Sequence, residues 1–114
     1  MALVFSSCAA KRKTALSDRV TAYHESCRWK DFTTASYYVE NQEDFLDRVK
    51  KSNIIEITEF EIVRVRTNSD STEATVQVRR VYTMSSSVSV QTQVIEQKWK
   101  YDRKKKDWFL VSPY

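Results

Sequence analysis

The stretch IIEITEFEIVRVR, residues 54–66, alternates apolar and polar side chains but changes phase along the way. Ile57 stands on one phase, Phe60 stands on the other, and Val63 returns to the first. Alternation with a period of two is typical of a β-strand with one buried face. A change of phase inside such a strand indicates a β-bulge, which bends the strand. We therefore expect a long strand that bends near Thr58.

Three further strand patterns follow, separated by short polar turns. Residues 72–84, TEATVQVRRVYTM, alternate more regularly, although Arg80 interrupts their apolar face. The third pattern, residues 88–101, changes phase again near Val94, and the last covers residues 108–111. The connecting turns are expected at residues 68–71, 85–87 and 103–106. Consecutive strands joined by short turns indicate an antiparallel sheet, and the two phase changes indicate that it is bent.

The front half of the chain carries helical patterns. In residues 14–30 the apolar side chains recur at helical spacing, and one face holds Leu16, Val20, Tyr23, His24 and Cys27. Asp31 is placed to cap a second, short helix through residue 38, and Asn41 is placed to cap a third through residue 51. Helices followed by consecutive strands indicate an α+β domain, with the sheet bent around the first helix.

The composition excludes several classes of protein. With 114 residues, the chain has room for one core, so residues 14–114 are expected to form one domain behind a tail of residues 1–13. It contains no glycine, which excludes the glycine-dependent phosphate loops, and we expect no cofactor. Its two cysteines, Cys8 and Cys27, and its one histidine, His24, cannot build a zinc site by themselves, so we expect no metal.

The charge pattern favours no nucleic-acid partner. The net charge is +4, but basic and acidic side chains are interspersed along the chain. The densest basic run, residues 103–106, is flanked by Asp102 and Asp107. We interpret it as a solvated turn between two strands rather than as a contact for lipid or nucleic acid.

The first residues resemble the end of a bacterial lipoprotein signal peptide. Phe5, Ser6, Ser7 and Cys8 stand where such proteins have a lipobox, although its first position usually holds leucine. The resemblance implies lipid attachment at Cys8 and a place at the cell envelope on the periplasmic side, with membrane contact only through that anchor. The apolar stretch before Cys8 is shorter than the ~7–15 residues of a signal peptide. The alternative is an ordinary N-terminus with a chance cysteine on a cytoplasmic protein.

The order of these elements resembles the NTF2-like (cystatin-like) α+β fold. The most specific likeness is the last hairpin, KWKYDRKKKDWFL at residues 98–110, which is similar to the closing tryptophan-rich hairpin of that family. The resemblance covers residues 14–111. It implies a cone, with the N-terminal helices packed in the concave face of the bent sheet around a pocket, and a homodimer formed through the sheet face. Members include a nuclear transport factor, steroid isomerases and dehydratases, so the resemblance implies no single activity.

Two hypotheses of function remain open. The first is a non-enzymatic domain that binds a small hydrophobic or anionic molecule, or a protein partner. The alternative is a small enzyme of the isomerase or dehydratase type with its site in the pocket. No residue aligns with a catalytic residue of the family, so none is predicted to be catalytic. Five side chains are candidates for ligand binding: Tyr23, His24, Arg80, Tyr82 and Trp99.

Of these candidates, Arg80 fits its predicted position worst, because its side chain is charged. A charge on an apolar face must be paired or must reach solvent. A salt bridge to Glu96 is one expectation for Arg80, and contact with an anionic ligand is the other. A pocket filled by Trp99, Phe60 and Tyr82 would exclude a small-molecule ligand, whereas an open cavity of roughly 300 Å³ with converging polar groups would support one.

Overall fold

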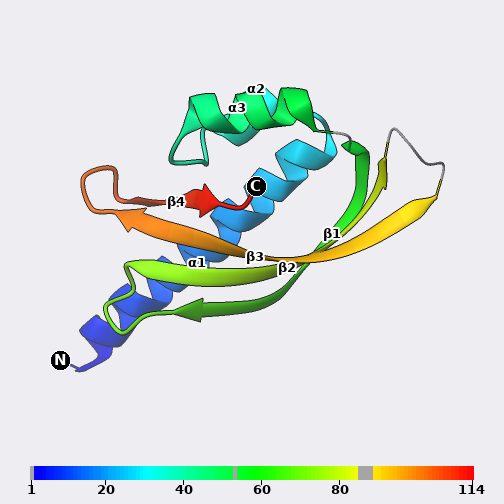
Figure 1. Cartoon of the computed structure of the whole chain (residues 1–114). Coiled ribbons are helices and arrows are strands. Elements are labelled where there is room, and N and C mark those ends of the chain that lie inside the picture. Colours follow the sequence, from blue (N-terminus) through cyan, green and yellow to red (C-terminus); the bar gives the residue numbers. More distant parts are fainter. Residues whose placement is uncertain (1, 53, 85–88) are drawn as a thin grey trace.

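Helix α1 crosses one face of a four-stranded antiparallel sheet, and two shorter helices lie beside its C-terminal half (Figure 1). The computed structural model describes the backbone of residues 2–52, 54–84 and 89–114, and the side chains of these residues except 2–9 and 55. The helices are α1 (Ala2–Arg28), α2 (Phe32–Ser36) and α3 (Gln42–Lys51). The strands are β1 (Ile54–Thr67), β2 (Glu73–Met84), β3 (Val90–Asp102) and β4 (Asp107–Ser112). The predicted α+β class is confirmed.

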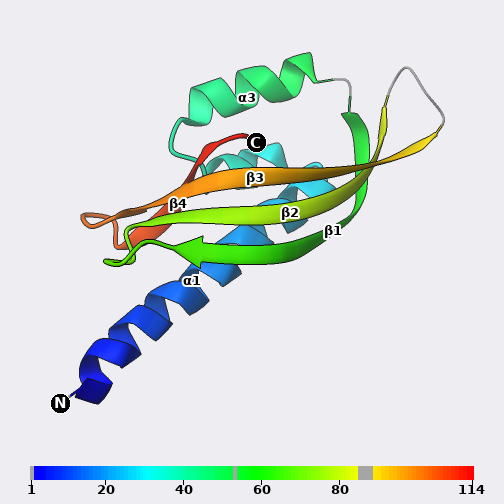
Figure 2. The same cartoon turned by 60° about the horizontal axis from the view of Figure 1, so that its bottom comes forward.

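The first helix begins earlier than the sequence pattern predicts. We expected a helix from residue 14 behind a tail, but α1 runs from Ala2 to Arg28. Residues 2–28 contain no glycine or proline, and alanine, lysine and arginine at residues 9–13 favour a helix. The prediction was wrong because it looked for an apolar face, and the N-terminal turns extend beyond the sheet where no such face is required (Figure 2).

The caps of the two short helices are as predicted. The Asp31 side chain accepts a hydrogen bond from the Thr34 backbone N–H at 3.2 Å, and Asn41 accepts one from the Asp44 backbone N–H at 3.0 Å. Each bond satisfies a donor that has no partner inside its helix. These two caps hold the turns that bring α2 and α3 back beside α1.

The predicted bend of β1 is confirmed, whereas the second predicted phase change is wrong. The pairing of β1 with β2 shifts register between Ile57 and Glu59, the position of Thr58. The pairing of β2 with β3 continues without a shift from Glu73 opposite Lys100 to Thr83 opposite Val90. The valines of β3 that suggested a phase change simply face outward. The predicted turn at residues 85–87 lies outside the described residues.

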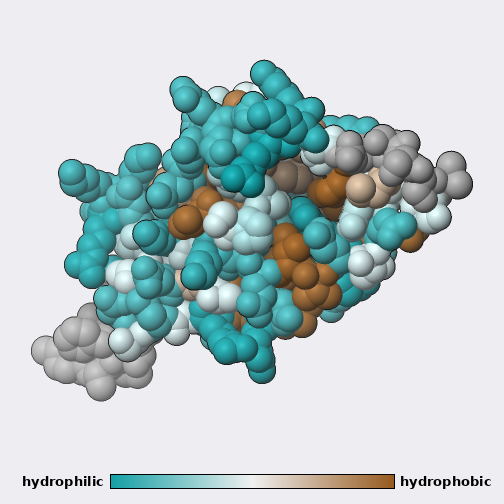
Figure 3. All heavy atoms as spheres, in the orientation of Figure 1, coloured by the Kyte–Doolittle hydropathy of each residue, from teal (hydrophilic) through white to brown (hydrophobic). Residues whose placement is uncertain are grey.

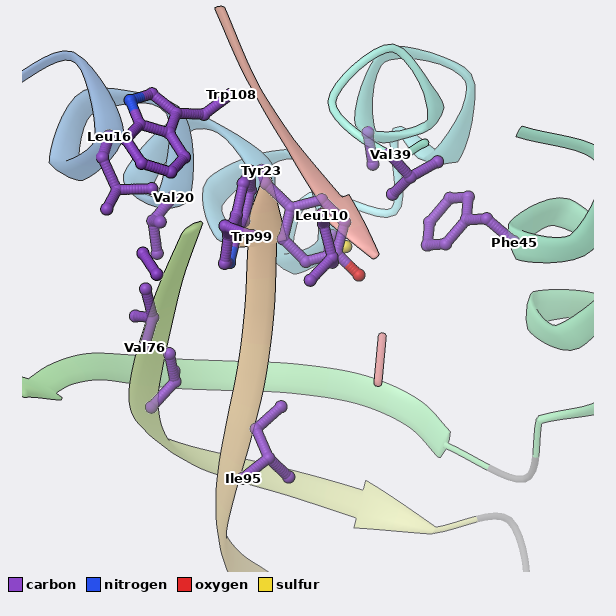
Figure 4. Close-up of a cluster of buried hydrophobic side chains, with 14 of the residues drawn as sticks. Leu16, Val20, Tyr23, Val39, Phe45, Val76, Ile95, Trp99, Trp108 and Leu110 are labelled. Carbon is purple, nitrogen blue, oxygen red and sulfur yellow. The ribbon is translucent and has the colours of Figure 1, made fainter. Parts of the chain in front are cut away.

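The core lies between α1 and the inner face of the sheet (Figure 4). The predicted apolar face of α1 is buried, including Leu16, Val20 and Tyr23. Two tryptophans of the last hairpin, Trp99 and Trp108, are fully buried against it. The buried apolar side chains of the sheet come from all four strands: Ile57, Ala74, Val76, Val78, Ile95, Trp99, Trp108 and Leu110. The predicted turn at residues 103–106 is present, and its four basic side chains are exposed.

The outer face of the sheet is polar with a few apolar side chains. Val63, Val90 and Val94 are 52%, 65% and 54% exposed. A space-filling view shows apolar atoms gathered over the strands with hydrophilic side chains around them (Figure 3). Among the described helices, none is both long enough and apolar enough to span a bilayer.

Candidate functional site

A cavity of about 290 Å³ lies between the C-terminal half of α1, helix α3 and the bent start of β1. Its apolar wall consists of Phe32, Phe45, Val49, Ile54 and Ile57. Four further lining residues carry polar groups: Tyr23, Cys27, Arg80 and Tyr114. The remaining lining residues are exposed and form the rim: Lys30, Arg48, Ser52 and Glu56. Three basic side chains against one acidic side chain make this lining electropositive.

The bend of β1 and the position of α3 leave this space unfilled. The pairing of β1 with β2 shifts register between Ile54 and Glu56 and again between Ile57 and Glu59, so the start of the strand bends away from a flat sheet. Helix α3 lies across that opening and presents Phe45 and Val49, which are one turn apart on the same face. The cavity therefore lies where the helices and the strand diverge.

Arg80 reaches the inner wall from β2 and is only 8% exposed. Its Nη1 donates to the main-chain oxygen of Tyr114 at 2.9 Å, and its Nη2 donates to Gln93 Oε1 at 2.8 Å. Its buried Nε has no hydrogen-bond partner among the described residues. Burial lowers the pKa of the guanidinium, because removing a charge from water disfavours the charged form. Arg80 is a buried cation that no described acidic side chain neutralises.

The predicted salt bridge between Arg80 and Glu96 is wrong. Glu96 lies opposite Gln77 in the pairing of β2 with β3, and its side chain is exposed on the outer face. Arg80 lies opposite Gln93, and both side chains point to the inner face. Because side chains alternate between the two faces, residues 80 and 96 of this hairpin cannot meet.

Tyr23 and Cys27 supply polar but uncharged groups to the same wall. The Tyr23 hydroxyl donates to the main-chain oxygen of Tyr114 at 3.2 Å. Burial raises the pKa of Tyr23 well above its ordinary value. Burial also raises the pKa of the Cys27 thiol to about 11. Both groups are therefore neutral near pH 7, and Cys27 is not an activated nucleophile.

His24 lies behind the cavity wall in a buried hydrogen-bond chain. Its Nε2 is 2.9 Å from Gln97 Oε1, while Gln97 Nε2 donates to the Pro113 carbonyl at 3.0 Å. The second bond assigns Oε1 of Gln97 as the acceptor, so His24 donates through Nε2 and its Nδ1 is unprotonated. Burial lowers the pKa of His24 to about 4. The imidazole is neutral, and it anchors the end of the chain.

Tyr114 closes one side of the rim. Its hydroxyl donates to Asp44 Oδ2 at 2.7 Å, and its ring packs edge-on against Phe45 with centroids 5.2 Å apart. Partial burial and the bond to Asp44 raise the pKa of Tyr114 to about 12, and the same bond lowers the pKa of Asp44. Residues 113–114 thus form a strap held by Arg80, Tyr23 and Gln97 from beneath and by Asp44 from above.

The five predicted ligand-binding residues do not all reach one site. Tyr23 and Arg80 line the cavity. His24 is 1% exposed and stacks on Phe60, outside the cavity lining. Tyr82 is half-buried and does not line it. Trp99 is fully buried, with its ring edge-on to Tyr23 at 6.0 Å.

No residue of the apolar wall was among the predicted site residues. Phe32, Phe45 and Val49 have the pattern of helix residues that face a core, and nothing in that pattern separates a cavity wall from solid packing. Tyr114 carries no sequence signal at all. Arg80 carried the one usable signal, a charged residue in the apolar phase of a strand.

Other features of the described surface are less suited to hold a ligand. A hollow of about 530 Å³ lies beside Arg66, Thr75, Lys98 and Lys100, and one of about 490 Å³ lies beside Glu43 and Lys105. Both are larger than the cavity, but mostly exposed polar side chains surround them. No cluster of three or more His, Cys, Asp or Glu side chains with metal-binding geometry occurs among the described residues.

Comparison with known proteins found no family model, no curated protein and no solved structure that matches this chain.

Proposed function

We propose that this protein is a non-enzymatic domain that binds a small molecule in the cavity between α1, α3 and β1. The observation that carries the proposal is an apolar cavity of about 290 Å³ with the buried Arg80 in its wall, whose Nε has no hydrogen-bond partner among the described residues. Small-molecule sites are typically apolar hollows with a few convergent polar groups. A buried charge without an acidic partner is unfavourable in a purely structural role.

The contacts in the wall favour binding over the isomerase or dehydratase alternative. Such a reaction needs a general base near the substrate. His24 is a poor base because its pKa is about 4 and it does not line the cavity. Glu56 is the only carboxylate in the described lining, and it is exposed at the rim. The remaining wall groups position a ligand but do not accept a proton from it near pH 7.

An NMR titration with 1-octanol, a neutral apolar probe, tests the cavity as a binding site. We expect shift changes confined to residues around the cavity, including Phe45 and Ile57. The variant Val49→Phe should abolish them because the larger ring fills the space. The control Val63→Phe makes the same change at an exposed position and should leave them intact. Shift changes that are absent, or that persist unchanged in Val49→Phe, would refute the proposal.

We also propose that the domain is NTF2-like. The order of three helices and four antiparallel strands, the bulge in β1 and the cavity beside α1 all support this proposal. An experimental structure in which the described sheet instead closes into a barrel, or lies flat without a cavity, would contradict it.

The proposal that the protein lies at the cell envelope rests only on the residues up to and including Cys8. Ser6, Ser7 and Cys8 support lipid attachment at Cys8. Mass spectrometry of the full-length gene product made in a bacterium should then find Cys8 acylated at the mature N-terminus, and an unmodified Cys8 would refute this placement.

Self-association through the outer sheet face is a second candidate role. The exposed Val63, Val90 and Val94 support it. Sedimentation at high micromolar concentration should show a dimer that Val94→Glu disrupts; a monomeric wild type would refute it.

A further inference from the structure

We infer that the ligand of this cavity is a small monocarboxylate with an apolar body, whose carboxylate pairs with Arg80. The inference rests on the proposed function, since it names the class of molecule that the same cavity binds. Three features of the described residues lead to it: the charge of the wall, the unpartnered Nε–H of Arg80, and the size and character of the remaining space.

The charge of the wall calls for an anion. Arg80 is buried and forms no ion pair with a described Asp or Glu side chain. The adjacent residue Arg79, on the other face of the same strand, pairs with both Glu59 and Glu61. The sheet therefore places acidic side chains beside the exposed arginine and none of the described ones beside the buried arginine. A ligand carboxylate would provide a negative charge that no described acidic side chain supplies to Arg80.

The hydrogen-bond donors of Arg80 favour a carboxylate. A guanidinium has five N–H donors in a planar fork that matches two carboxylate oxygens. The bonds of Arg80 to Tyr114 and Gln93 use Nη1 and Nη2, and its Nε–H has no partner among the described residues. Tyr114 and Gln93 also hold the guanidinium in place before a ligand arrives. A single buried cation suits one carboxylate better than a dianionic phosphate, which needs more positive charge.

The rest of the cavity favours an apolar body of limited length. Away from Arg80, much of the cavity wall is apolar and suits an apolar ligand body. These wall residues are Phe32, Phe45, Val49, Ile54 and Ile57. A cavity of about 290 Å³ lies at the small end of the range for ligand sites, which favours a short ligand. A straight-chain acid of about eight carbons and a phenyl-substituted acid are both short ligands of this class. At the rim, Arg48 already pairs with Asp44 at 3.1 Å, so it offers less to a second carboxylate.

Calorimetric titration of the full chain at pH 7 separates the two parts of such a ligand. Octanoate has both the charge and the body, 1-octanol has the body alone, and acetate has the charge alone. We expect octanoate to bind about ten- to a hundredfold more tightly than 1-octanol, the usual range for hydrogen bonds to a charged group. Acetate should show no measurable binding, because it buries almost no apolar surface.

Variants of the paired arginines locate the effect. Arg80→Met should abolish the preference for octanoate over 1-octanol, so that the two molecules bind the variant with equal affinity. Arg79→Met removes the same charge one residue away and should leave the preference for octanoate intact. Arg80→Lys keeps the charge but not the fork, and it should retain only part of the preference. Thermal melts of each variant establish that it is folded before it is titrated.

Other outcomes would overturn the inference or the proposal beneath it. Equal affinity for octanoate and 1-octanol in the wild type would refute the carboxylate and leave the binding site standing. Loss of both ligands in a folded Arg80→Met variant would show that Arg80 shapes the cavity and would also refute the inference. Binding of neither molecule to the wild type would refute the proposed function itself.

Discussion

Arg79 and Arg80 are neighbours in β2 and stand on opposite faces of one sheet. On the outer face Arg79 donates to Glu61 Oε2 at 3.1 Å and pairs with Glu59 Oε1 at 3.4 Å. On the inner face Arg80 is held by Gln93 and by the main-chain oxygen of Tyr114, and no described carboxylate side chain reaches it. Arg79, which has access to water, has two acidic partners, whereas the buried Arg80 has none among the described Asp and Glu side chains.

This difference separates a structural role from a functional one. Exposed ion pairs contribute little to stability, so the pairs of Arg79 are an ordinary surface feature. A buried guanidinium without an acidic side chain beside it costs desolvation free energy, and a ligand cavity beside it gives a reason for its presence. The following predictions test the contrast between the two faces, from the largest expected effect to the smallest.

His24 should make the inner side of the sheet sensitive to mild acid. Its pKa of about 4 lies below the ordinary value of 6.5, so the unfolded chain binds a proton first as the pH falls. The stabilising contribution of neutral His24 is complete above pH 6.5 and is lost as the pH falls toward 4. Over that window it amounts to about 3 kcal/mol. Urea unfolding at several pH values should show this loss.

The matched variant for this prediction is His24→Phe. It retains a ring that can stack on Phe60 and removes the titrating group. Its free energy of unfolding should change little between pH 6.5 and 4.5. The exposed carboxylates Asp70 and Asp102 have pKa values below the ordinary 3.8, so they titrate under more acidic conditions. A variant with the same pH dependence as the wild type would contradict this assignment.

The same truncation on the two faces should have different costs. Val78→Ala removes two methyl groups from a fully buried position and should lower the free energy of unfolding by about 2 kcal/mol. Val94→Ala makes the same change at a position that is 54% exposed, and it should change that free energy by less than about 0.5 kcal/mol. Equal losses in chemical denaturation would mean that the outer face is covered in solution.

The two arginines should respond in opposite ways to replacement by methionine. Arg79→Met loses exposed ion pairs and should lower the free energy of unfolding by less than about 1 kcal/mol. Arg80→Met replaces a buried charge that pairs with no described acidic side chain by an apolar chain, and it should leave the stability of the ligand-free protein unchanged or raise it. A loss of more than about 2 kcal/mol in Arg80→Met would indicate that its bonds to Gln93 and Tyr114 are structural.

Much of the fold could be predicted from local sequence patterns. The caps at Asp31 and Asn41, the bulge at Thr58 and the apolar face of α1 are signals within a few residues, and the structure confirms them. The outward orientation of Val94 was missed because apolar character alone does not determine whether a strand residue faces the core or the solvent. The early start of α1 was missed because that part of the helix has no core-facing pattern.

The candidate site was harder to predict, for a physical reason. Its wall combines Phe32 and Phe45 from two helices, Ile57 from a bent strand and Tyr114 from the end of the chain. Whether such residues fill a space or leave it open depends on the distance between elements, which no local pattern encodes. Arg80 was the exception, because a charge in the apolar phase of a strand conflicts with burial and therefore stands out in the sequence.

The most direct test of the central claim is the NMR signal of the arginine side-chain Nε–H groups, recorded before and after addition of octanoate. The Nε–H of Arg80 has no partner among the described residues, whereas that of Arg79 donates to Glu61. We predict that octanoate shifts the Arg80 signal strongly and leaves the Arg79 signal in place. An Arg80 signal that does not move while octanoate occupies the cavity would contradict the account.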